Sequence, residues 1–71
     1  MKFYIESKAY ETQKSMLTVK EIFDLAKENP ERLTLALKTS NGYHEYEGHE
    51  LITIDRSLHF IFFDKRPTYN A

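Results

Sequence analysis

One short helix signal stands among segments that otherwise have strand character, and this contrast limits the fold most. Thr18 is followed three residues later by Glu21, the spacing of a capping box, in which each side chain bonds a backbone N–H of the first helical turn. Leu17 before the cap and Ile22 after it form the matching hydrophobic staple. The pattern predicts a helix from Thr18 to about residue 28. It ends there because Pro30 disfavours helical geometry in the residue before it.

Strand signals precede the helix. Residues 3–5 and 9–13 are rich in the aromatic and β-branched residues that favour strands. A two-residue turn at residues 7–8 would bring the second segment back antiparallel and set Ile5 opposite Tyr10. The N-terminal part of the chain is therefore predicted to be a hairpin.

A second hairpin follows the helix. Leucines occupy every second position over residues 33–37, which predicts a half-buried strand. Asn41 and Gly42 form the strongest short hairpin signal, because both tolerate positive φ. A turn at these two residues pairs Lys38 with Glu45, an attractive cross-strand contact.

The final segments complete the predicted topology. Residues 51–56 are a connecting segment with apolar anchors, and residues 57–63 are an apolar, aromatic strand. The order is strand, strand, helix, strand, strand, strand, so one amphipathic helix covers one face of a mixed sheet. This is the pattern of an α+β fold of the β-grasp type, with residues 1–64 as the domain and residues 65–71 as a flexible tail. The predicted core consists of Phe3, Ile5, Val19, Ile22, Phe23, Ala26, Leu33, Leu35, Leu37, Leu58, Phe60 and Phe62.

Alternation along the last strand separates core residues from candidate binding residues. If its even-numbered apolar residues face the helix, then His59, Ile61 and Phe63 face away from it. Tyr4 and Ala36 join the same surface from neighbouring strands. An apolar surface of this kind indicates a docking site for a protein partner. The alternative is the opposite register, or a surface covered by the tail or by another copy.

Composition excludes several classes of function. The formal net charge of −1 and the pI near 6.3 argue against nucleic acid as a partner. The absence of cysteine excludes a thiolate metal site and a cysteine nucleophile, and it fits the cytoplasm. No apolar run approaches the ~20 residues of a membrane span. We expect His44 and His49 to be solvated or packing residues rather than metal ligands. The scattered acidic residues form no catalytic pair, so we expect neither an enzyme nor a cofactor.

These residues resemble the ubiquitin-like family. The run at residues 57–62, Ser-Leu-His-Phe-Ile-Phe, resembles ubiquitin's last strand, Ser-Thr-Leu-His-Leu-Val-Leu. The chain is most similar to bacterial ubiquitin-like domains of the multi-ubiquitin type. The shared features, in chain order, are Phe3-Tyr4-Ile5, Tyr10, the Thr18–Glu21 capping box with Ile22 to Ala26, Pro30-Glu31, and the aromatic strand from Phe60 to Phe63.

The resemblance implies a protein modifier of a bacterial conjugation pathway. Its relatives act with an activating enzyme, a conjugating enzyme and a deconjugating or processing peptidase, and several such systems are linked to antiviral defence. The target protein is not indicated. The alternatives are a non-conjugated adaptor and, less favoured, a sulfur carrier. The open edges of a small sheet also allow self-association.

The tail departs from the family pattern. Ubiquitin and sulfur carriers end in Gly-Gly, whereas Tyr69, Asn70 and Ala71 stand here as the candidate conjugation or processing residues. Either the tail is trimmed, for example by removal of Ala71, or the activating enzyme accepts a larger residue, or the chain is not conjugated. Lys65 and Arg66 are expected to guide the tail into an acidic groove on a processing enzyme, or to be a plain solvated linker.

Overall fold

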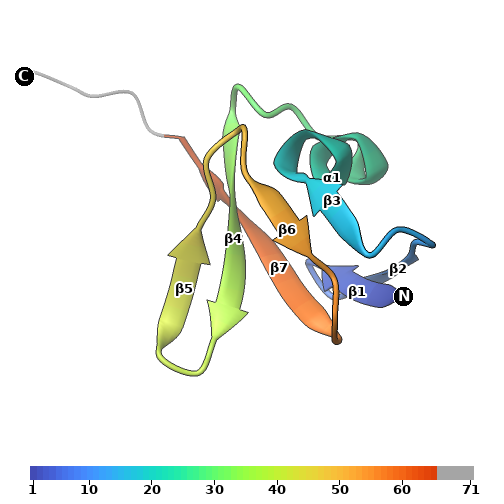
Figure 1. Ribbon diagram of the computed structural model, residues 1–71. Coiled ribbons are helices and arrows are strands. Elements are labelled where there is room, and N and C mark those ends of the chain that lie inside the picture. Colours follow the sequence, from blue (N-terminus) through green and yellow to red (C-terminus); the bar gives the residue numbers. More distant parts are fainter. Residues whose placement is uncertain (66–71) are drawn as a thin grey trace, which may run out of the picture.

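A five-stranded mixed sheet is crossed on one face by a helix and by a short two-stranded ribbon (Figure 1). The computed structural model describes residues 1–65. The strand order of the sheet is β2-β1-β7-β4-β5, and the ribbon pairs β3 with β6. The elements are β1 (Lys2–Ile5), β2 (Lys8–Glu11), β3 (Met16–Thr18), α1 (Val19–Ala26), β4 (Leu33–Thr39), β5 (Gly42–Glu45), β6 (Leu51–Thr53) and β7 (Leu58–Asp64).

The last strand lies at the centre of the sheet. β7 pairs parallel with β1, where Tyr4 lies beside His59, and antiparallel with β4, where Ala36 lies opposite Ile61. Two ends of the chain that are far apart in sequence therefore lie side by side (Figure 1). The predicted α+β class, with one helix and a mixed sheet among residues 1–65, is confirmed.

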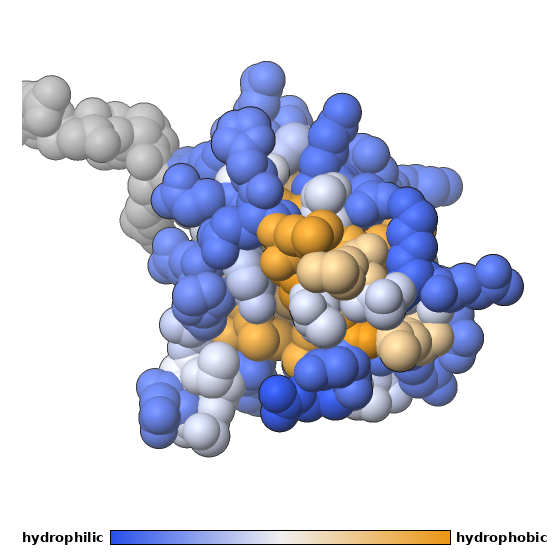
Figure 2. Space-filling view, viewed as in Figure 1, coloured by the Kyte–Doolittle hydropathy of each residue, from blue (hydrophilic) through white to orange (hydrophobic). Residues whose placement is uncertain are grey.

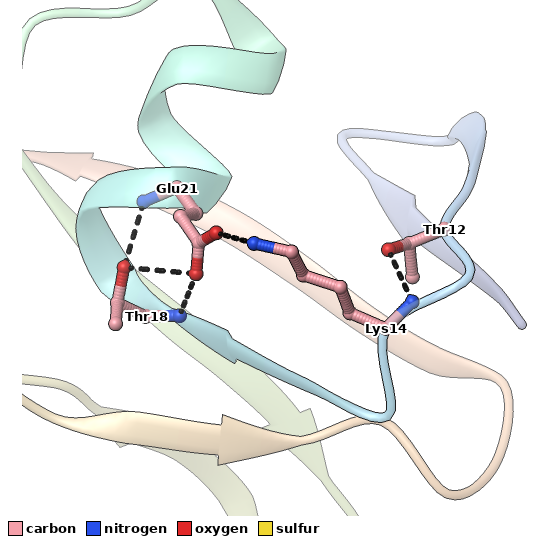
Figure 3. Close-up of polar contacts among 4 residues, drawn as sticks. All are labelled: Thr12, Lys14, Thr18 and Glu21. Atoms are coloured by element: carbon pink, nitrogen blue, oxygen red, sulfur yellow. Dashed lines mark hydrogen bonds and ion pairs between the residues drawn. The ribbon is translucent and has the colours of Figure 1, made fainter.

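The capping box forms as predicted at the start of α1 (Figure 3). The Thr18 amide donates to Glu21 Oε1 at 2.9 Å, and the Glu21 amide donates to Thr18 Oγ1 at 3.1 Å. Lys14 Nζ also donates to the second carboxylate oxygen of Glu21. The side chain of Glu21 thus joins the segment before β3 to the first turn of the helix.

The helix ends earlier than the sequence predicted. Its last residue is Ala26, and Lys27 adopts the left-handed conformation with φ 59° and ψ 43°. The amides of Lys27 and Glu28 donate back to the carbonyls of Asp24 at 3.2 Å and Phe23 at 3.0 Å. These bonds satisfy carbonyls that the last turn leaves free. A local cap, rather than Pro30, therefore ends the helix.

The first hairpin has a different register from the predicted one. Its turn residues are Glu6 and Ser7, with φ 52° and 72°, so Ile5 lies opposite Lys8 rather than Tyr10. Glu6 also extends the contact with β7, because its amide donates to the carbonyl of Phe60 at 3.0 Å. The predicted register is therefore wrong by two residues, and a two-residue shift keeps every side chain on its predicted face.

The register of the second hairpin also differs from the predicted register by two residues. Ser40 and Asn41 form its turn, and Thr39 lies opposite Gly42. Gly42 takes the positive φ, at 134°. Lys38 therefore lies opposite Tyr43, and the predicted pairing of Lys38 with Glu45 is wrong.

The segment predicted as a connector contains a strand. Residues 51–53 form β6, which pairs antiparallel with β3 so that Leu17 lies opposite Ile52. The amide of Ile54 continues the contact by donating to the carbonyl of Ser15 at 2.8 Å. Ile52 and Ile54 are buried, so the predicted apolar anchors close one side of the core.

The core matches the predicted set and extends it. Seven predicted members are buried: Phe3, Ile5, Val19, Ile22, Phe23, Leu35 and Phe60. The other predicted members, Ala26, Leu33, Leu37, Leu58 and Phe62, pack against them half-buried. Rings of Phe23 on α1 and Phe62 on β7 have centroids 5.0 Å apart. The helix is therefore held over the central strand by direct aromatic contact.

We expect Lys27→Gly to stabilise the protein by about 0.5–1 kcal/mol. Glycine adopts the left-handed conformation without the steric cost that a Cβ carries. Urea unfolding followed by far-UV circular dichroism measures the change, with Glu28→Gly as the control. A Lys27→Gly protein that is less stable than the wild type would contradict this account of the helix end.

Glu21 should make stability depend on pH. The hydrogen bond from Lys14, followed by the bond from the Thr18 amide, lowers the pKa of Glu21 below its ordinary value of 4.5. A lowered pKa stabilises the fold above the unfolded-state value, and this contribution is lost as pH falls through the folded-state value. The melting temperatures of the wild type and Glu21→Gln should therefore differ most at neutral pH and converge below pH 4.5. A difference that is constant with pH would contradict a charged Glu21 in the cap.

Candidate docking surface

The face of the sheet turned away from α1, called here the outward face, is the candidate functional site. Its middle is formed by β7, the central strand. Phe60 is buried and its neighbours Leu58 and Phe62 are half-buried against the core, whereas His59 and Phe63 are exposed. The predicted division of the last strand into core and outward residues is confirmed.

Two aromatic pairs lie on the outward face. The rings of Tyr4 and His59 are stacked, with centroids 4.7 Å apart and planes 5° apart. The rings of Tyr43 and Phe63 meet edge to face, with centroids 5.3 Å apart. Such contacts restrict side-chain rotation, so each pair presents a fixed shape to a partner. Ile61 lies between the two pairs along β7 and is half-buried.

 The predicted residues of the outward face differ in their exposure. Phe63 is 37% exposed, and His59 is also open to solvent. Ala36 was predicted to contact a partner, but it is fully buried. The physical reason is its small side chain, which lies opposite the larger Ile61. Ala36 therefore shapes the floor of the face and offers no contact area.

Tyr43 was missed by the sequence prediction of the site. It pairs with Lys38 on β4, and residues opposite each other on paired strands share a face. The signal was present, because Glu45 was predicted to lie on the same face as Lys38 and alternation places Tyr43 there too. Tyr43 is 53% exposed, compared with 37% for Phe63, so it offers the more accessible ring of that aromatic pair.

The start of the predicted tail is fixed to the domain. The Lys65 amide donates to the carbonyl of Arg32, and Lys65 Nζ donates to the carbonyl of Pro30, both at 2.8 Å. Lys65 therefore lies against the segment between α1 and β4. Arg66 and the candidate conjugation residues Tyr69, Asn70 and Ala71 lie outside the described residues.

A second apolar surface lies on the opposite side of the molecule. Figure 2 shows apolar side chains gathered over the β3–β6 ribbon beside α1. The ribbon carries Met16, 43% exposed, and Leu51, 55% exposed. The sequence prediction did not include these residues, because it had no strand pairing that would bring residues 16 and 51 onto one ribbon.

Between α1 and β4 lies a hollow of about 360 Å³, lined in part by Val19, Phe23, Leu35 and Tyr46. Burial raises the pKa of the Tyr46 phenol, and the nearby carboxylate of Glu50 adds to the shift. Both causes favour the neutral phenol. Tyr46 therefore contributes a polar but uncharged wall to this hollow.

Among residues 1–65, no three His, Cys, Asp or Glu side chains gather closely enough to hold a metal ion. Within the same range, no helix has the length and apolar character needed to cross a bilayer.

Comparison with family models, curated proteins and solved structures gave no significant match.

Truncation of two phenylalanines on β7 should distinguish its two faces. Phe60 is 1% exposed and Phe63 is 37% exposed. We expect Phe60→Ala to cost about 3–5 kcal/mol of unfolding free energy, because it opens a cavity in the core. Phe63→Ala should cost about 1 kcal/mol. Urea unfolding measures both, and equal losses for the two variants would contradict the assigned faces.

Proposed function

We propose that this chain is a β-grasp, ubiquitin-like protein modifier that docks on its enzymes through the outward face. The strand order β2-β1-β7-β4-β5, with a parallel central pair and one helix across the sheet, is compatible with a β-grasp domain. The observation that carries the proposal is the position of β7. The same strand supplies the exposed residues His59 and Phe63 and leads directly into the tail.

In this proposal the chain supplies recognition and its partners supply the chemistry. An activating enzyme would bind the outward face and receive the tail that follows β7. The conjugated carboxylate would belong to Tyr69, Asn70 or Ala71 after any trimming by a peptidase. The nucleophile would lie on the target or on a relay enzyme, because this chain has no cysteine.

A non-conjugated adaptor is the second candidate, and the ribbon surface favours it. Met16 and Leu51 lie exposed on the ribbon, away from the outward face. Two separate apolar surfaces would let one domain hold two partners at once. An adaptor of this kind needs no reactive tail.

Isolation of covalent adducts tests the proposal. We expect the full chain, tagged at its N-terminus and purified from its native host under denaturing conditions, to carry larger covalent species. Peptide mass spectrometry should then show a target lysine joined to Tyr69, Asn70 or Ala71. The control ends at residue 65, keeps every described residue and should form no adduct. A full chain without adducts that still retains partners under native conditions would indicate the adaptor instead.

Substitution of Ile61 tests the docking surface separately. Ile61→Glu places a charge between the two aromatic pairs, and we expect it to weaken binding of a captured partner about tenfold or more. Because Ile61 is only half-buried, the variant should keep its folded circular dichroism spectrum. Gln13→Glu, at an exposed position between β2 and β3, is the control. Equal binding by both variants would contradict docking through the outward face.

A further inference from the structure

A basic pocket opens at the end of the sheet where β4 and β7 separate. Their pairing ends with Leu37 opposite Phe60. The chain beyond that pair leads into the β4–β5 turn on one side and the β6–β7 loop on the other, both at the lower end of Figure 1. A pocket of about 430 Å³ lies between these segments, with Leu37 and Leu58 among its lining residues.

Three basic side chains line this pocket. Lys38 comes from β4, Arg56 from the β6–β7 loop and His59 from β7. Stacking on the Tyr4 ring at 4.7 Å restricts the orientation of His59. Three different segments therefore bring cationic or proton-donating groups to one place.

Hydroxyl groups complete the lining. Thr39, Ser40 and Ser57 contribute them, and no carboxylate belongs to the part of the lining that the structure describes. Asp55 lies nearby, with Oδ1 3.5 Å from Arg56 Nε. Both members of that pair are largely exposed, and an exposed pair of this kind is weak. Arg56 is therefore able to exchange Asp55 for another anion.

We propose that this pocket binds a phosphoryl group, either as free phosphate or as a phosphorylated serine side chain. Arginine and lysine are the usual partners of phosphate oxygens, and hydroxyls donate further hydrogen bonds to the same oxygens. The volume of about 430 Å³ accommodates a phosphate together with part of the group that carries it. This inference does not depend on conjugation, because none of its residues lies in the tail.

Phosphate titration followed by NMR tests the proposal. The ¹⁵N-labelled full chain is titrated with inorganic phosphate, and separately with a short phosphoserine peptide and its unphosphorylated form, at constant ionic strength. We expect shift changes centred on residues 38–40 and 56–59 with at least one phosphorylated ligand. Binding of phosphate alone identifies a free-anion site, whereas tighter binding of the phosphopeptide identifies a phosphorylated protein. No localised change with either ligand overturns the proposal.

Charge-matched variants separate a built site from general electrostatic attraction. We expect Lys38→Gln and Arg56→Gln each to weaken binding about tenfold, the loss of one charge-assisted contact. Lys20→Gln removes the same charge from an exposed position on α1 and should leave affinity within about twofold. Asp55→Asn should strengthen binding, because it removes the anion that competes for Arg56. Equal weakening by Lys20→Gln, or weaker binding by Asp55→Asn, would contradict the site.

Discussion

The parallel pairing of β1 with β7 is the contact on which the rest of the structure depends. It joins Tyr4 to His59 and Ile5 to Phe60, so the two ends of the described chain become the middle of the sheet. Because β7 is then paired on both sides, its inner residues must meet the helix and its outer residues must meet solvent. The core, the outward face and the position of the basic pocket all follow from this one placement.

Side-chain faces could be predicted from the sequence, whereas pairing registers could not. Alternation has a period of two, so it assigned Phe60 to the core and Phe63 to solvent regardless of register. The predicted registers of both hairpins were wrong by two residues, because Glu6, Ser7 and Ser40 carry little turn preference of their own. The β3–β6 ribbon has three residues in each strand, too few to give a periodic signal. Its partners are distant in sequence, and only the folded chain brings them together.

The same limit of sequence reasoning applies to the outward face and to the basic pocket. Alternation predicted the outward residues of β7 but could not show that Ala36 is too small to reach solvent beside Ile61. The basic pocket was invisible in the sequence, because Lys38 and Arg56 are far apart along the chain and meet only where β4 and β7 separate. The proposed modifier function and the proposed phosphoryl site share His59 and otherwise use different residues. The first uses the middle of β7 and the tail, and the second uses the end where β7 begins.

A two-dimensional NOE spectrum of the full chain tests the placement of β7 most directly. The account predicts cross-peaks between the rings of Tyr4 and His59 and between those of Tyr43 and Phe63, whose centroids are 4.7 Å and 5.3 Å apart. It also predicts cross-peaks between Phe62 and Phe23 of α1. Cross-peaks from His59 to the side chains of α1, with none to Tyr4, would show that β7 is turned over or paired elsewhere, and would contradict the account.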